Sequence, residues 1–324
     1  MHAVVASMVL MSALASMAHA QGSPTLSHAK QQFDARNWDA AKQEYTSLAR
    51  TVPNDVAPTL YLGRIALAQS DADEAIKQFE RCADIDERNP ECHAWLGNAL
   101  GMTAQRTSKF KLPFLAKRTK REFDRAVELD PNNVDGRFGE LQYYLNAPGF
   151  LGGSAAKARE QAAEIEKRDK LRGALAYAAI ADHDTDARAA EVAYQRAITV
   201  ASDSIAGYSG LANVYVREKR WADAFGMLDR IAARIPTEWS IPLSVARVAL
   251  LSGEQLPRAE EGLKRWIGNT PPLAPFHSKA TAHFRLGQIY EKTSRKELAM
   301  PEYEMALTIN PKLEDAKKAL DALK

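Results

Sequence analysis

This sequence has almost no excess of positive or negative charge, only two cysteines and no recognisable catalytic motif. Its 43 Lys and Arg residues nearly balance its 41 Asp and Glu residues, which leaves a formal net charge of +2. A chain so close to neutral has no overall field that would attract a polyanion, so we expect no nucleic-acid partner. Its only cysteines, Cys82 and Cys92, form neither a C-x-x-C redox motif nor the cysteine pairs of a zinc site.

Motifs for catalysis and for cofactor binding are also missing. Gly149 to Ser154 lacks the Gly-Lys-Ser/Thr triplet of a nucleotide P-loop, and no nucleophile elbow surrounds a serine. His277 and His283 do not have the spacing of a helical zinc site. Asp182 to Asp186 begins like a calcium loop but lacks its glycine and closing glutamate, so helix capping explains it better. The sequence therefore indicates a protein without catalytic activity, bound metal or cofactor.

Long apolar runs are confined to the beginning of the chain. Val4 to Ala18 contains no charged residue, and Ala18-His19-Ala20 has the small-x-small pattern of a cleavage site. This pattern predicts a signal peptide over residues 1–20, cleaved after Ala20, and export to the periplasm or beyond. The segment is atypical because no Lys or Arg precedes its apolar core. The alternative is a retained membrane anchor, for which the run is short.

The two cysteines lie on either side of a predicted boundary between helices. Cys82 falls near the end of one predicted helix, and Cys92 falls in the first turn of the next, after Pro90. An exported compartment would permit a disulfide between them, provided that their α-carbons lie within about 7 Å of each other. The alternative is a pair of buried thiols that serve as small hydrophobic side chains. The sequence leaves both interpretations open.

The sequence is rich in one recurring pair, an alanine followed four residues later by an aromatic residue or leucine. The pairs are Ala41/Tyr45, Ala75/Phe79, Ala190/Tyr194, Ala224/Leu228, Ala259/Leu263 and Ala299/Tyr303. Pairs in adjacent repeats are roughly 34 to 40 residues apart, which is the period of stacked two-helix units. Several are preceded by a Leu-Gly or Leu-Ala motif, at Leu62-Gly63, Leu96-Gly97, Leu211-Ala212 and Leu286-Gly287. Prolines close many units, at Pro53, Pro131, Pro236, Pro271 and Pro311.

This pattern resembles the tetratricopeptide repeat family over nearly the whole chain after residue 20. The resemblance implies an all-α fold: a right-handed superhelical solenoid of about eight helix hairpins with a C-terminal capping helix. The repeats are expected at about 22–55, 56–89, 90–133, 134–169, 170–204, 205–238, 239–279 and 280–313. The capping helix is expected at 312–324, so that residues 21–324 form one solenoid. Small residues mark the points where two helix axes approach, and stacking makes the core continuous.

Three insertions interrupt the repeat period. The third repeat has roughly ten extra residues around Met102 to Pro113, which places its second helix at Arg118 to Leu129. The fourth has about five extra residues around Asn146 to Gly153. Hairpin turns of successive repeats project from the same edge of a solenoid, so we expect these insertions to touch. A third insertion, Pro272 to Ser278, separates the last two repeats.

The first two insertions carry complementary chemistry. One is basic with interleaved apolar residues, and the other is a glycine-rich turn into a helix N-terminus, where an anion could sit. The candidate residues for this edge site are Lys109, Lys111, Lys117, Arg118, Lys120, Arg121, Gly152, Gly153 and Ser154. The plainer interpretation is a solvated helix face beside a loop that needs glycine in order to turn.

The family resemblance also implies a concave groove lined by the first helix of each hairpin. At one equivalent position, which faces the groove in the family, this sequence has Lys30, Arg64, Asn98, Gln142, Asn213, Arg247 and Gln288. A ladder of side-chain donors can hold an extended peptide by its carbonyl groups. Polar residues also belong on any solvent-facing stripe, so these positions predict a groove lining and leave its specificity open.

Two functions follow as hypotheses. The first is a non-catalytic scaffold in the exported compartment that binds a protein or peptide partner in its groove. The second is a module that binds an anionic ligand, or makes peripheral contact with an anionic membrane or cell-wall surface, through the two insertions. Its affinity would fall with added salt. The identity of the partner and the oligomeric state are not written in a repeat scaffold.

Overall fold

Every regular element in the described part of the protein is helical. The computed structural model describes residues 25–104, 107–108, 110–269 and 276–323. The predicted signal peptide, Lys109, Pro271 and residues 272–275 of the third insertion lie outside these ranges. The predicted all-α class is confirmed.

Helices α2 to α17 follow one another through the described chain as eight consecutive pairs, and α18 comes last. The pairs are α2 (Leu26–Asp34) with α3 (Trp38–Thr51), α4 (Val56–Ala68) with α5 (Ala72–Ile85), α6 (Pro90–Ala104) with α7 (Leu112–Leu129), α8 (Val134–Asn146) with α9 (Ala155–Arg168), α10 (Lys170–His183) with α11 (Ala187–Val200), α12 (Ile205–Arg217) with α13 (Trp221–Arg234), α14 (Ile241–Ser252) with α15 (Leu256–Gly268), and α16 (Phe276–Lys292) with α17 (Lys296–Ile309). The short 3-10 helix η1 (Gly149–Leu151) lies between α8 and α9, and α18 spans Glu314–Leu323.

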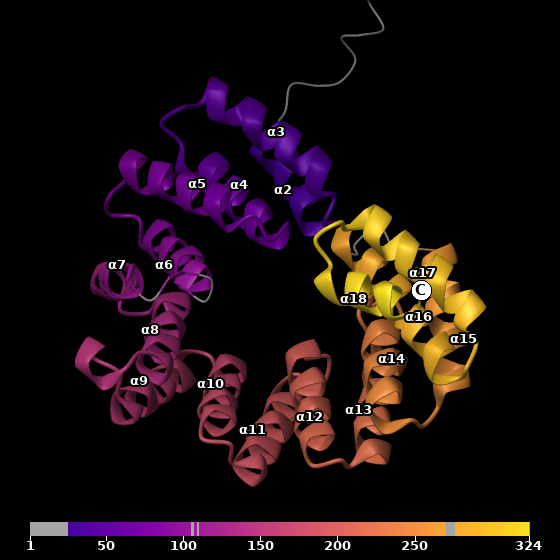
Figure 1. Ribbon diagram of the computed structural model, residues 1–324. Coiled ribbons are helices and arrows are strands. Elements are labelled where there is room, and N and C mark those ends of the chain that lie inside the picture. The colour runs from indigo at the N-terminus through magenta and orange to yellow at the C-terminus, as the bar shows by residue number, and fades with distance from the viewer. Residues whose placement is uncertain (1–24, 105–106, 109, 270–275, 324) are drawn as a thin grey trace, which may run out of the picture.

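The pairs stack along a strongly curved path. Figure 1 shows the chain bending around an open centre, with the first helix of most pairs on the inside of the curve and the second on the outside. First helices of neighbouring pairs contact each other directly, as α6 contacts α8 and α14 contacts α16. The predicted repeat solenoid is confirmed, and its inner surface is built from the helices that were expected to line a groove.

Local sequence explains where the helices begin and end. Asp55, Asp71 and Ser204 precede α4, α5 and α12, and each side chain accepts a hydrogen bond from a backbone N–H in the first turn. Four of the predicted closing prolines, Pro53, Pro131, Pro236 and Pro311, each lie two residues beyond the end of a second helix. Proline cannot continue a helix, because it lacks the N–H donor and clashes with the preceding turn.

Glycines on first helices let the two helices of a hairpin approach closely. A Cβ atom added to Gly63 would lie 2.4 Å from the Phe79 ring, and one added to Gly97 would lie 2.6 Å from the Phe123 ring. Gly287 packs in the same way on Tyr303, at 2.5 Å. These contacts confirm the predicted crossing points. The alanine of every recurring pair is also buried, and of the larger partners only Tyr194 is partly exposed.

The second helix of the third pair begins earlier than the sequence predicted. Its expected start was Arg118, whereas α7 begins at Leu112 and is 18 residues long. Pro113 sits in its first turn, where a proline is tolerated because that N–H has no partner within the helix. The predicted start was therefore wrong, because residues 112–117 already belong to α7.

Cys82 of α5 and Cys92 of α6 are joined by a disulfide, with a distance of 5.6 Å between their α-carbons. Both side chains are completely buried. The bond ties the second hairpin to the third across the short loop between them. None of the described helices has both the length and the apolar character needed to cross a bilayer.

Candidate partner-binding groove

The predicted ladder residues lie on seven first helices, in environments that divide the inner surface into three parts. Lys30 and Arg64 belong to α2 and α4 at the N-terminal end. Asn98 and Gln142 belong to α6 and α8 and line a cavity in the middle of the solenoid. The remaining three, Asn213, Arg247 and Gln288, line two adjoining pockets on α12, α14 and α16.

The cationic residues at the N-terminal end are occupied by contacts within the protein. The Lys30 ammonium donates to Asp34 one turn away, at 2.6 Å. The Arg64 guanidinium lies 4.8, 5.1 and 5.0 Å from the ring centres of Phe33, Tyr61 and Trp95. Stacking of this kind holds a guanidinium in one orientation. Arg64 is thus fixed among three aromatic rings on two hairpins and the start of a third.

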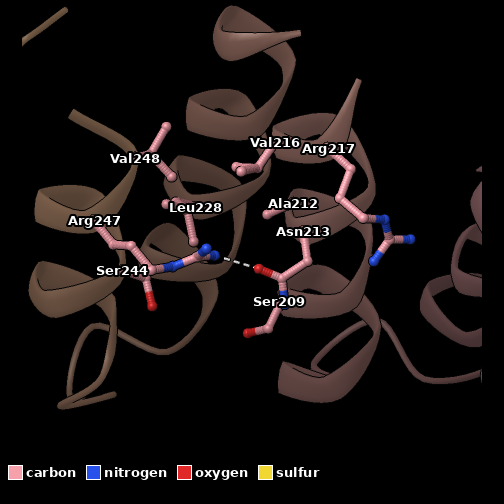
Figure 2. A pocket seen from close by; sticks show the side chains of 9 residues that line it. All are labelled: Ser209, Ala212, Asn213, Val216, Arg217, Leu228, Ser244, Arg247 and Val248. Atoms are coloured by element: carbon pink, nitrogen blue, oxygen red, sulfur yellow. Dashed lines mark hydrogen bonds between the residues drawn. The ribbon is translucent and has the colours of Figure 1, made fainter. Parts of the chain in front are cut away.

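The first of the C-terminal pockets lies between α12 and α14. It has a volume of about 480 Å³, and its polar lining includes Ser209 and Asn213 of α12 and Ser244 and Arg247 of α14. Figure 2 shows Asn213 and Arg247 pointing toward each other across this pocket, where the Arg247 guanidinium donates to the Asn213 side-chain oxygen. Two of the predicted ladder residues are therefore in direct contact.

The second pocket adjoins the first because Arg247 lines both. It has a volume of about 620 Å³ and lies between α14 and α16, where Arg285, Gln288 and Lys292 face it. Arg285 donates to the carbonyl oxygen of Leu243 at 2.5 Å, and Lys292 donates to that of Leu250 at 2.7 Å. We call the surface formed by Asn213, Arg247, Arg285, Gln288 and Lys292 the basic groove.

The three cationic side chains of the basic groove donate hydrogen bonds to uncharged oxygen atoms. Among the described residues, no carboxylate forms an ion pair with Arg247, Arg285 or Lys292. Burial lowers the pKa of Arg247, and burial together with the nearby charge of Arg247 lowers the pKa of Arg285 to about 10. Both groups are still charged at neutral pH. Two partly desolvated guanidinium groups that repel each other raise the free energy of the folded protein, and an anion bound between them would lower it.

Sequence reasoning identified three members of the basic groove and missed Arg285 and Lys292. The signal was nevertheless present: these residues lie three positions before and four positions after Gln288, so all three share one face of α16. The prediction followed one position per repeat and did not extend along the helix face. Glu291 also lines the second pocket, and its carboxylate accepts a hydrogen bond from the Tyr303 hydroxyl at 2.8 Å.

The cavity in the middle of the solenoid joins the two insertions, as predicted. It has a volume of about 420 Å³, and Asn98 and Gln142 lie on its polar side. Met102 and Leu112 from the first insertion and Leu151 from the second belong to its apolar lining. α7 also contacts η1 directly. The two insertions therefore form one edge of the molecule.

The basic residues of the edge site divide into paired and unpaired groups. Arg118 forms an ion pair with Glu80 of α5, and Lys120 forms one with Asp124 at 2.7 Å. Arg121 is 3.6 Å from Glu122 and largely exposed. Lys111 and Lys117 are exposed as well, and no ion pair joins either to a described carboxylate. Lys109 lies outside the described residues.

The glycine-rich turn is explained by its own geometry. Gly152 has a φ of 95°, which favours glycine, and a Cβ atom on Gly153 would lie 1.8 Å from the carbonyl oxygen of Ala147. The Ser154 hydroxyl caps α9 by accepting a hydrogen bond from the backbone N–H of Lys157, at 3.3 Å. Anion binding at this helix start stays a prediction.

Comparison with known proteins identifies the repeat. Family models described as tetratricopeptide repeat match residues 26–90 and residues 280–313, one near each end of the solenoid. The chain contains tetratricopeptide repeats. These matches cover α2 to α5 and nearly all of α16 and α17, and the intervening hairpins continue the same architecture.

A solved structure shows the same kind of fold. The crystal structure of yeast Tom70 is similar with a TM-score of 0.53 and 10% sequence identity, covering 91% of this chain and 80% of that one. A tetratricopeptide repeat protein from Parabacteroides merdae ATCC 43184 is 13% identical, with a TM-score of 0.47, covering 92% of this chain and 96% of that one. At 10% identity, the similarity to yeast Tom70 shows the fold alone. A search of curated proteins finds no match to the sequence.

Proposed function

We propose that this tetratricopeptide repeat protein is a non-catalytic scaffold that binds an acidic, extended segment of a partner protein in its basic groove. Repeat solenoids present preformed concave surfaces that are used for binding. The observation that carries the proposal is a pair of partly buried guanidinium groups, Arg247 of α14 and Arg285 of α16, that form no ion pair with a described carboxylate. Such cations favour an anionic ligand.

The arrangement suits a peptide better than a small anion. The two pockets adjoin at Arg247 and together span the inner faces of three hairpins. Carboxylates of the partner would pair with Arg247 and Arg285, since a guanidinium offers paired donors to a carboxylate. The amides of Asn213 and Gln288 can both donate to and accept from a peptide backbone. Recognition of both charge and backbone is what an extended acidic segment supplies.

We place the scaffold in an exported compartment, such as the periplasm. The apolar run Val4 to Ala18 and the small-x-small site before Gln21 support this assignment. The buried disulfide between Cys82 and Cys92 is consistent with it, because disulfides persist in oxidising compartments and are rare in the cytosol. Cell fractionation followed by N-terminal sequencing tests it: a mature chain that begins at Gln21 outside the cytosol is expected, and a full-length cytosolic chain would contradict it.

A displayed library of random peptides tests the binding proposal, because the selection itself reveals which peptide chemistry the groove prefers. Residues 21–324, which contain every described helix, should enrich peptides with clustered Asp and Glu. The same selection with an Arg247→Gln, Lys292→Gln variant should lose that enrichment. An Arg64→Gln variant is the matched control, because Arg64 has the equivalent repeat position but stacks among aromatic rings. Enrichment that is independent of acidic residues, or equal in all three proteins, would contradict the proposal.

A further inference from the structure

Three phenylalanine side chains project into solvent from the edge formed by the two insertions. Phe110, Phe114 and Phe150 are 97%, 77% and 84% exposed, and no other large hydrophobic residue in the described ranges is as exposed. A phenylalanine left in water forgoes roughly 1.5–3 kcal/mol of burial free energy. Three such side chains at one edge indicate a surface that is covered in use.

The phenylalanines are held in place by the fold. Phe110 lies two residues before the first residue of α7, and Phe114 lies in the first turn of that helix. Phe150 is the central residue of η1, which is fixed to α8 because the Tyr143 hydroxyl donates to the carbonyl oxygen of Leu151 at 2.7 Å. The contact between α7 and η1 brings the two segments together. The side chains are thus displayed from two braced turns.

The sequence segments that carry the phenylalanines contain positive but no negative side chains. The sequence contains no Asp or Glu from residue 92 to 121 or from residue 141 to 159. Lys117 and Arg121 follow Phe114 at spacings of three and seven residues, so these three side chains share the exposed face of α7. Lys111 is exposed in the turn before that helix. The edge therefore combines exposed aromatic rings with Lys111 and Lys117, which form no ion pair with a described carboxylate, and with Arg121, which lies 3.6 Å from Glu122.

We propose that this edge, defined by Phe110, Lys111, Phe114, Lys117, Arg121 and Phe150, is a peripheral attachment site for a bilayer that contains anionic phospholipid. The phenylalanine rings would enter the boundary between headgroups and acyl chains, and the cations would contact headgroup phosphates. Aromatic and basic side chains on one face are typical of helices that lie in the membrane interface. Lysine is depleted from protein interfaces, which favours lipid over a protein surface as the occupant. The proposal does not depend on the basic groove.

Vesicle cosedimentation tests the attachment site. The protein is residues 21–324, because this chain contains every described helix and lacks the apolar leader, whose own affinity for lipid would mask the effect. The probes are vesicles of phosphatidylcholine alone and vesicles in which about one third of the lipid is phosphatidylglycerol. Binding is expected to the second kind only, and it should weaken at high salt.

Variants assign the binding to this edge. Phe110→Ser, Phe114→Ser, Phe150→Ser should weaken binding at least about a hundredfold, since partial burial of each ring contributes several-fold to tenfold. Lys111→Gln, Lys117→Gln should weaken it about fivefold for each charge removed. The matched controls are two double variants, Val192→Ser with Met305→Ser and Lys42→Gln with Lys170→Gln. Both change exposed residues elsewhere and should leave binding unchanged. Circular dichroism checks that each variant is folded.

Three results would overturn the proposal. The first is no binding to vesicles that contain phosphatidylglycerol. The second is binding that the edge variants do not weaken more than the controls do. The third is self-association of the parent protein in sedimentation velocity, without binding to vesicles, that is lost in the phenylalanine variant. That result would make a second copy of this chain the occupant of the edge.

Discussion

A carboxylate buried between α7 and α8 makes the stability of this solenoid depend on pH. Glu140 is only 7% exposed, and its Oε2 atom has no hydrogen-bond partner. Burial, a hydrogen bond with Asp124 and the charge of Asp124 together raise the pKa of its carboxyl to about 7, against the opposing charges of Lys120 and Arg137. At neutral pH, folding must therefore keep a proton on Glu140 or bury its charge.

The sign of the effect follows from proton linkage. The pKa of Glu140 is higher in the folded protein than its ordinary value of 4.5, so the folded state holds the proton more tightly. Stability from this group is fully present below pH 4.5 and is lost as the pH rises through about 7. The difference between the two pKa values corresponds to roughly 3 kcal/mol above pH 8, as an upper bound because Glu140 and Asp124 titrate together.

Glu140→Gln removes the titration and keeps the volume and a donor for Asp124. We expect the variant to be more stable than the parent protein at pH 8, by about 1–3 kcal/mol, and nearly equal to it at pH 5. Urea unfolding of both proteins at a series of pH values measures this difference. The contributions of all other titrating groups cancel in it, because the two proteins share those groups. Glu128→Gln on the exposed side of α7 is the control and should show no such trend. A Glu140→Gln variant that is less stable at pH 8, or a difference that does not change with pH, would refute the reasoning.

Two further predictions concern packing and the disulfide. Replacing Cys82 and Cys92 by alanine should lower the free energy of unfolding by about 2–3 kcal/mol, because the bond closes a loop with a sequence separation of 10. Urea unfolding without reductant measures this, and an unchanged midpoint would contradict it. Gly97→Ala should destabilise by about 1–3 kcal/mol, because the new Cβ atom would lie 2.6 Å from the buried Phe123 ring. Gly226→Ala is the matched control: no atom lies within 4 Å of its added Cβ, so higher helix propensity should make it neutral or stabilising in thermal melting.

Features that depend on neighbours within one hairpin could be predicted from the sequence. The contact of Gly63 with Phe79 and the ends of helices before Pro131 and Pro236 follow from local rules about helix packing and proline. The start of α7 could not be predicted in this way. The repeat length suggested a loop before Arg118, whereas the real helix absorbs those residues and begins at Leu112.

Features that depend on neighbouring hairpins were less predictable. Arg64 and Arg247 occupy equivalent repeat positions, yet one is surrounded by aromatic rings and the other opens onto two pockets. The difference arises from residues supplied by adjacent repeats, which a single repeat does not specify. The details of the edge formed by the two insertions were equally hard to predict: Leu112 lines the cavity, whereas Phe114, two residues later, faces solvent. Once the start of α7 is known, the helical period separates the two.

The most direct test of the central claim is the affinity of an acidic peptide, taken from the library selection, for the groove and its variants. Isothermal titration of residues 21–324 should give binding that weakens roughly tenfold or more with Arg247→Gln, because a charge-assisted hydrogen bond contributes about 1.5–3 kcal/mol. Arg64→Gln should leave the affinity within about twofold of the parent value. Equal affinity for the parent protein and Arg247→Gln, or a loss caused by Arg64→Gln alone, would contradict the assignment of the basic groove as the binding site.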